Sequence, residues 1–111
     1  MTTLYRVGPL PEEVLAASAR FHGQVLPDVQ AQLAGGGGLI LVFAPADHTH
    51  RGWRLALVQQ LARDHAPVRV NAVASDDEAA IAATARYLKM ADGVTGQYLP
   101  LDETGAGAIL Y

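Results

Sequence analysis

The chain has 111 residues, of which 50% are hydrophobic and 17% are charged, with a formal net charge of −3 at pH 7. This length predicts one domain over residues 1–111, and the hydrophobic content excludes an intrinsically disordered protein. The sequence has no cysteine, which excludes disulfide bonds and thiolate chemistry. No Lys/Arg cluster supplies the basic face that nucleic-acid binding requires, so we expect no nucleic-acid partner.

The N-terminal residues lack a basic segment followed by an apolar core, so no signal peptide is predicted. The longest apolar run, residues 39–45, is too short to cross a bilayer. We therefore expect a soluble, cytoplasmic protein that does not associate with membranes.

In chain order, residues 3–7 predict a short edge strand, which the following glycine and prolines end. Acidic residues at 12–13 favour the start of a helix, and apolar residues recur at helical spacing as far as Leu33. Pro27 lies inside this stretch, so it predicts a kink or break near Leu26.

Glycines 35–38 end this helix and precede the continuous apolar run 39–44, which is typical of a strand buried on both faces. A second helix is predicted from about residue 48 to residue 65, with Asp47 placed as its N-cap. Residues 68–74 predict a second buried strand.

Ser75 and Glu78 form a capping-box pattern at the start of a third helix, which should end near Gly93. Residues 97–101 predict a further strand, and a glycine-rich tail follows. Asn71 lies within an apolar strand and needs a hydrogen-bond partner if it is buried. This alternation predicts an α/β fold, with a small parallel sheet of three or four strands, flanking helices and right-handed crossovers.

Four segments occur in a characteristic order: G-G-L-I at 37–40, L-A at 61–62 ahead of A-P at 66–67, V-R-V-N-A-V at 68–73, and T-G-Q at 95–97 followed by Leu99 and Asp102. From about Glu12 to Asp102 the chain thereby resembles the C-terminal half of the short-chain dehydrogenases/reductases. The resemblance implies a truncated Rossmann-like fold without the nucleotide-binding half.

The family's catalytic residues have no counterparts at the matching positions. Its tyrosine and lysine positions fall on Asp47 and Arg51, and its serine position falls around Ala44 or Pro45. An aspartate of ordinary pKa holds no proton to donate at neutral pH, and arginine does not reproduce the role of the lysine. We therefore assign no catalytic residue and expect a pseudoenzyme.

A dinucleotide site needs a strand, a glycine-rich turn and then a helix, in that order. Glycines 35–38 instead follow a helix and precede a strand, so they are interpreted as a helix terminator. We assign no cofactor.

The most polar segment of the chain is D-H-T-H-R at 47–51, at the predicted junction of a strand and a helix, where open α/β sheets usually bind ligands. Asp47, His48, His50 and Arg51 are therefore our candidate ligand-binding residues. A metal held by the first three and an anion held by Arg51 with helix N-terminal amides are both open. The simpler alternative is an N-cap and a solvated first turn, and we assign no metal.

Three functions are compatible with these features. The first is a non-catalytic scaffold or interaction protein that forms a homodimer or higher homo-oligomer. The resemblance places its interface on the helices near 12–33 and 48–65, which carry broad apolar faces. The second is a small-ligand or metal-binding protein, or a weak enzyme, that uses residues 47–51. The third is a subunit that complements a partner carrying the nucleotide-binding half.

Overall fold

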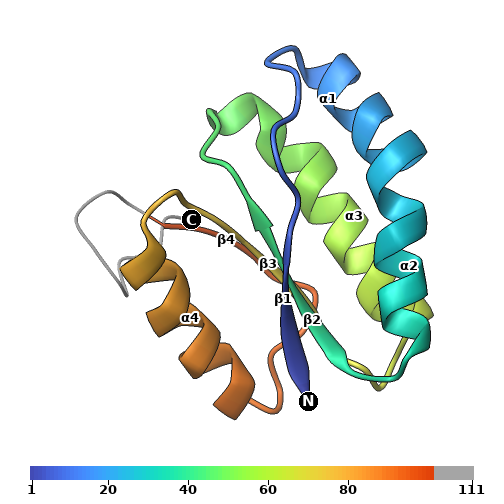
Figure 1. Cartoon of the computed structure of the whole chain (residues 1–111), viewed down its shortest axis with the longest axis vertical. Helices are drawn as coiled ribbons and strands as arrows, with labels where there is room; N and C mark the ends of the chain where they lie inside the picture. The colour runs from blue at the N-terminus through green and yellow to red at the C-terminus, as the bar shows by residue number, and fades with distance from the viewer. Residues whose placement is uncertain (102–111) are drawn as a thin grey trace.

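The computed structural model describes residues 1–101 and contains a four-stranded parallel sheet (Figure 1). The strands lie side by side in chain order: β1 (Thr2–Arg6), β2 (Gly38–Phe43), β3 (Val70–Ala74) and β4 (Tyr98–Pro100). The helical segments are α1 (Val14–Arg20), a π-helical turn (Phe21–Val25), α2 (Leu26–Ala34), a 3₁₀ turn (His48–His50), α3 (Arg51–Asp64) and α4 (Glu78–Met90). The predicted α/β, Rossmann-like fold is confirmed. Asp102 and the glycine-rich tail lie outside the described residues.

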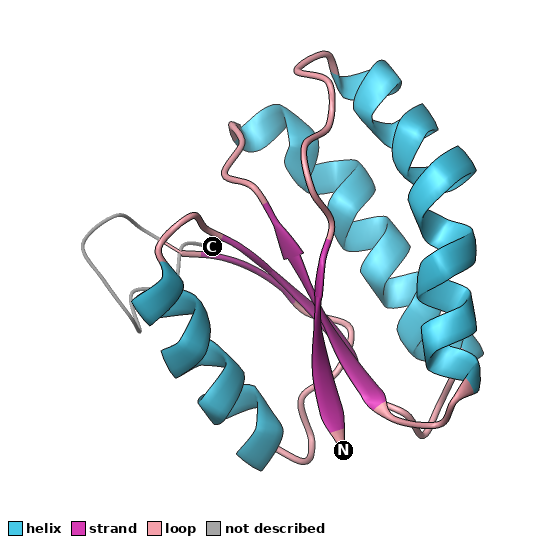
Figure 2. Cartoon of the chain, viewed as in Figure 1, coloured by secondary structure: helices cyan, strands magenta, loops and turns pink. Residues whose placement is uncertain are grey.

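Helices cover both faces of the sheet, with α1, α2 and α3 on one face and α4 on the other (Figure 2). Successive side chains of a strand point to opposite faces, so the continuous apolar run of β2 supplies both layers. The first layer contains Leu39, Leu41 and Phe43, and the second contains Ile40 and Val42.

The connection through α4 has the opposite hand to the other two. All three connections step in the same direction across the sheet, but α4 crosses the other face (Figure 1). The first two are right-handed, as such connections usually are, so the third is left-handed, unlike the expectation from sequence. Its position covers an apolar layer that α1 to α3 do not reach, because Ile81, Ala85 and Leu88 of α4 pack there against β2, β3 and β4.

The predicted irregularity near Leu26 is confirmed and takes the form of a π-helical turn. The N–H of Leu26 donates to the carbonyl of Phe21, five residues earlier, and Pro27 follows in the first turn of α2. Proline lacks an N–H, and its ring clashes with the carbonyl four residues before it in a regular helix. The widened turn therefore lies where the proline requires it.

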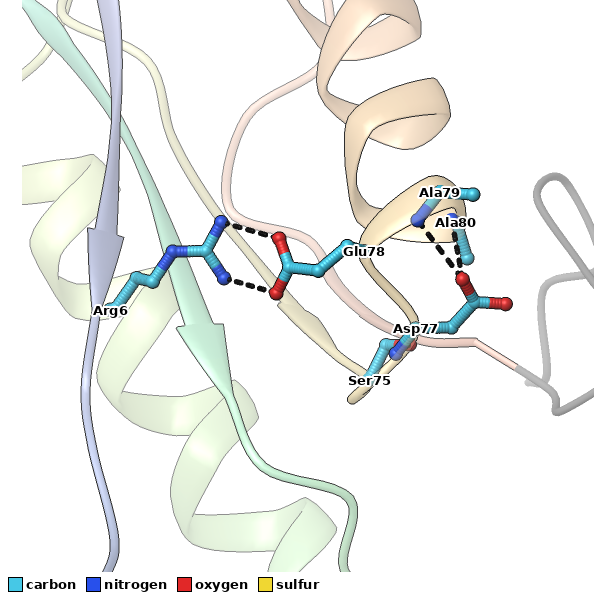
Figure 3. Close-up of polar contacts among 6 residues, drawn as sticks. All are labelled: Arg6, Ser75, Asp77, Glu78, Ala79 and Ala80. Atoms are coloured by element: carbon cyan, nitrogen blue, oxygen red, sulfur yellow. Dashed lines mark hydrogen bonds and ion pairs between the residues drawn. The ribbon is translucent and has the colours of Figure 1, made fainter.

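The predicted capping box at the start of α4 is wrong. Asp77 is the N-cap, and its carboxylate accepts from the N–H groups of Ala79 and Ala80 (Figure 3). The N–H of Ser75 donates to the carbonyl of Phe43, so it is not free to bind Glu78. Glu78 instead forms a two-pronged ion pair with Arg6 of β1, both bonds being 2.8 Å (Figure 3).

Asn71 is buried and has the partners that the sequence requires. Its Nδ2 donates to the carbonyl of Val94 at 3.0 Å, and its Oδ1 accepts from the N–H of Gln97 at 3.0 Å. Between them, Gly96 has φ +74°, and its N–H donates to the carbonyl of Val70. A side chain is strained at this φ, so the turn before β4 requires the glycine.

The apolar faces of the helices near 12–33 and 48–65 mostly point into the protein. Large side chains such as Val29, Leu57, Val58 and Leu61 are buried in the first core layer, whereas Leu15 is 76% exposed. In the part of the chain that the structure describes, no helix is long and apolar enough to span a membrane.

Candidate functional site

A pocket of about 220 Å³ opens beyond the carboxyl ends of β1 and β2. The loop after β1 contributes residues 8 and 10–12, and the loop after β2 contributes residues 44–47. His50 and Arg54 line the pocket from the 3₁₀ turn and the first turn of α3. Ligands usually bind at this edge in open α/β sheets.

Asp47 lies at the pocket and is an N-cap, as predicted, but it caps the 3₁₀ turn that leads into α3, which begins at Arg51. Its Oδ1 accepts from the backbone N–H of Thr49 at 2.9 Å and from the Thr49 hydroxyl. The bond from the hydroxyl, then the bond from the backbone, lower the pKa of Asp47 below its ordinary value. Asp47 is therefore ionised at neutral pH.

His50 is buried, and both of its ring nitrogens are engaged. Nε2 lies 2.9 Å from the carbonyl oxygen of Glu12, and Nδ1 lies 3.1 Å from Nε1 of Trp53. The Trp indole can only donate, so Nδ1 accepts from it and Nε2–H donates to Glu12. His50 thus ties the loop after β1 to α3 and has no free nitrogen for a ligand.

Arg54 is the most unusual residue of the pocket, because it is a buried cation with 4% exposure. Its Nη1 donates to the carbonyl of Ala44 and to the hydroxyl of Tyr98, both at 3.0 Å. Its guanidinium carbon lies 4.5 Å from the ring centroid of Phe43 and within 6 Å of the centroids of Trp53 and Tyr98.

No carboxylate pairs with Arg54 among residues 1–101, where the ion pair between Arg6 and Glu78 is the single salt bridge. The Nε of Arg54 is buried and has no hydrogen-bond partner in the same part of the chain. Buried charges in proteins are normally paired, because an unpaired one loses its hydration without compensation. Arg54, which lines the pocket, therefore carries a buried positive charge that no carboxylate of residues 1–101 balances.

A family model described as SDR-like, short chain dehydrogenase-like protein, matches residues 5–101. The chain belongs to this short chain dehydrogenase-like family. Searches of the curated proteins and of the solved structures gave no match to the chain. The match confirms the resemblance seen in the sequence at the level of the family.

Of the four residues predicted at the site of this short chain dehydrogenase-like domain, Asp47 and His50 line the pocket, whereas His48 and Arg51 do not. His48 is exposed, and Arg51 is half-buried. Among residues 1–101 no group of three His, Cys, Asp or Glu side chains could hold a metal ion. The geometry of His50 likewise gives no support to the metal alternative.

Arg54 was not predicted, because the candidate residues all lie in the polar segment 47–51. Its spacing was the available signal, since positions 50, 54, 57, 58 and 61 recur at the intervals of one helix face. His50, Leu57, Val58 and Leu61 at the other four positions are buried. An arginine at a core position of the helix that follows the ligand-binding loop indicates a buried cation near that loop.

Proposed function

We propose that this short chain dehydrogenase-like domain binds a small anionic ligand, with Arg54 as its counter-ion, and performs no dehydrogenase chemistry. The observation that carries the proposal is the buried guanidinium of Arg54 at the wall of the pocket, which has no carboxylate partner among residues 1–101. A bound anion would supply the missing partner.

The surroundings of Arg54 favour a ligand over a purely structural role. Two bonds from Nη1 and the ring of Phe43 hold the guanidinium in place, so a ligand would not have to order it. The two N–H groups of Nη1 are used within the fold and Nε is buried, so a carboxylate would meet Arg54 at Nη2, as a charge-assisted hydrogen bond. The pre-set geometry therefore fits recognition of a carboxylate.

The pocket volume limits the ligand to a small molecule. Pockets for drug-sized ligands occupy roughly 300–1,000 Å³. The pocket beside Arg54, at about 220 Å³, is smaller. We therefore propose a metabolite-sized carboxylate and not a dinucleotide.

The non-catalytic part of the proposal rests on the residues at the family's catalytic positions. Asp47 is an ionised N-cap, which has no proton to donate at neutral pH. Arg51 lies outside the pocket lining, and Ala44 and Pro45 have no polar side chain. Glycines 35–38 lead from α2 into β2, in the reverse order to a dinucleotide-binding loop. These features support a domain equivalent to the C-terminal half of the family fold.

Titration calorimetry with acetate, propionate and butyrate tests the anion site. We expect saturable binding to the wild-type chain, loss of binding in Arg54→Met, and retention in Arg63→Met, which removes an exposed arginine from the same helix. Equal binding by all three proteins would place the anion elsewhere. Absence of binding to all of them, both by these acids and by the matching amino acids, would overturn the proposed function.

The homo-oligomeric scaffold, the first of the three functions compatible with the sequence, is our second candidate, and Leu15 favours it. This leucine in α1 is 76% exposed, whereas the other large apolar side chains of α1, α2 and α3 are buried or half-buried. A second copy of the chain that packs on the outer side of these helices would cover it. Such an assembly is compatible with ligand binding, since Leu15 does not line the pocket.

A further inference from the structure

We propose that the ligand is a zwitterion of amino-acid type, whose carboxylate meets Arg54 and whose ammonium group meets the carboxylates of Asp47 and Glu12. This inference rests on the proposed anion-binding function and specifies its ligand.

The charges of the pocket lining carry the inference. Arg54 is its cation, whereas Glu12 and Asp47 are two acidic residues on the loops that follow β1 and β2. His50 balances neither charge, because its Nδ1 accepts from Trp53 and its Nε2–H donates to the Glu12 carbonyl. One wall therefore presents a positive charge, and the rim presents two negative charges.

The two acidic groups are not neutralised within the described part of the chain. Neither Asp47 nor Glu12 forms an ion pair among residues 1–101. Asp47 uses Oδ1 to cap the 3₁₀ turn, which leaves Oδ2 without a hydrogen bond in the same region. Both residues are exposed, whereas Arg54 is buried. A ligand would thus place its carboxylate inward and its positive end at the rim.

Charge complementarity separates the possible ligands. A simple carboxylate would satisfy Arg54 but lie near two like charges, which weakens its binding. A phosphate dianion would be repelled more strongly for the same reason. A zwitterion satisfies the cation and the two carboxylates together. The pocket volume of about 220 Å³ lies below the range of roughly 300–1,000 Å³ for drug-sized ligands, which suits a ligand as small as an amino acid.

The test compares ligands that differ only in their ammonium group. Calorimetric titrations of the full chain would use the pairs glycine and acetate, L-alanine and propionate, and 4-aminobutyrate and butyrate. We expect the zwitterion of at least one pair to bind about two- to fivefold more tightly than its matched acid, the size of effect that an exposed ion pair provides. L-Alaninamide, which keeps the ammonium group and lacks the carboxylate, should bind more weakly than L-alanine.

Two substitutions assign the effect to the named residues. Asp47→Asn keeps an oxygen that can cap the helix but removes the charge, so it should reduce the preference for the zwitterion within each pair. Arg54→Met should abolish binding of both members. Equal affinities within every pair would overturn the proposal of a zwitterionic ligand but not the anion site. A preference for the zwitterion that is unchanged when Asp47→Asn and Glu12→Gln are combined would have the same consequence. Absence of binding by every acid and every zwitterion would overturn both.

Discussion

The Nη1 of Arg54 donates a hydrogen bond to the Tyr98 hydroxyl at 3.0 Å, which links α3 to β4. The ring of Phe43, at the end of β2, lies 4.5 Å from the same guanidinium. Side chains of β2 and β4 therefore hold the guanidinium of Arg54 beside the pocket. The Nε of this guanidinium has no hydrogen-bond partner among residues 1–101. This arrangement suits a group kept for binding and not for stability.

Arg54→Met should change the free energy of unfolding by less than about 1 kcal/mol or increase it. Replacing a buried charge by an apolar side chain of similar size relieves its desolvation, which offsets the lost hydrogen bonds. Urea denaturation of the ligand-free protein measures the change. A loss of about 3 kcal/mol or more would show that Arg54 is a structural element of the core.

Arg69→Met is the matched control for this measurement. Arg69 donates to the carbonyls of Leu88 and Ala91 at 2.8 Å, at the C-terminal end of α4. Its removal leaves these acceptors without their charged donor, so we expect a loss of about 2 kcal/mol. The contrast between the two arginines separates a binding role from a structural one.

Trp53→Phe should destabilise the protein by about 1–3 kcal/mol, because the buried Nδ1 of His50 loses its donor. Phenylalanine keeps an aromatic ring at this position, where Trp53 packs against Phe21 and Phe43. Thermal unfolding of the two proteins gives the difference. An unchanged stability would mean that the hydrogen bond between Trp53 and His50 does not help to hold the loop after β1 against α3.

Tyr5 provides a pH-dependent test of the contact between β1 and α2. Burial, and then the hydrogen bond to Asp28 and its charge, raise the pKa of Tyr5 from 10.0 to about 12. The fold thus favours the neutral phenol, so this contribution to stability is complete below pH 10 and is lost as the pH rises towards 12. Asp28→Asn should lower the pKa of Tyr5, but burial should keep it above 10.0.

Phenolate absorbance, followed as the difference between the wild-type chain and Tyr5→Phe, isolates this titration. The same difference recorded in the Asp28→Asn background gives the effect of the carboxylate. If the pKa of Tyr5 did not fall in Asp28→Asn, the bond of 2.7 Å between these two residues would not exist in solution.

Leu15→Glu tests the second candidate function. We expect light scattering to show an oligomer for the wild-type chain and a smaller species for the variant, because the charge would be buried without a partner at the interface. Gln30→Glu is the matched control, since it adds the same charge at an exposed position of α2. A monomeric wild-type chain at micromolar concentration would contradict the oligomer.

Local sequence patterns were sufficient for much of the fold. The apolar run of β2 predicted a strand buried on both faces, Pro27 predicted the distortion before α2, and Asp47 predicted a helix cap. Each prediction depends on neighbouring residues only. The hand of the third connection depends instead on which sheet face remains uncovered, which spacing along the chain does not encode.

The errors at the cap of α4 and at the candidate site both arise from contacts between segments that are distant in the sequence. Ser75 matched a capping pattern, but its N–H is already bonded to Phe43 in the adjacent strand. The sequence directed attention to Arg51 because it adjoins the polar loop, whereas Arg54 reaches the pocket from the buried face of α3. Helical spacing could have placed Arg54 in the core. Its lack of a partner among residues 1–101 required the fold.

The most direct test of the anion site follows the Nε–H resonance of Arg54 by ¹⁵N NMR while L-alanine or propionate is added. Because Nε shares the charge of the guanidinium, a carboxylate bound at the pocket side of Arg54 should shift its resonance in a saturable way. The Nε–H resonance of Arg69, whose guanidinium binds the end of α4, should stay in place. An Arg54 resonance that neither ligand changes would contradict the proposed site.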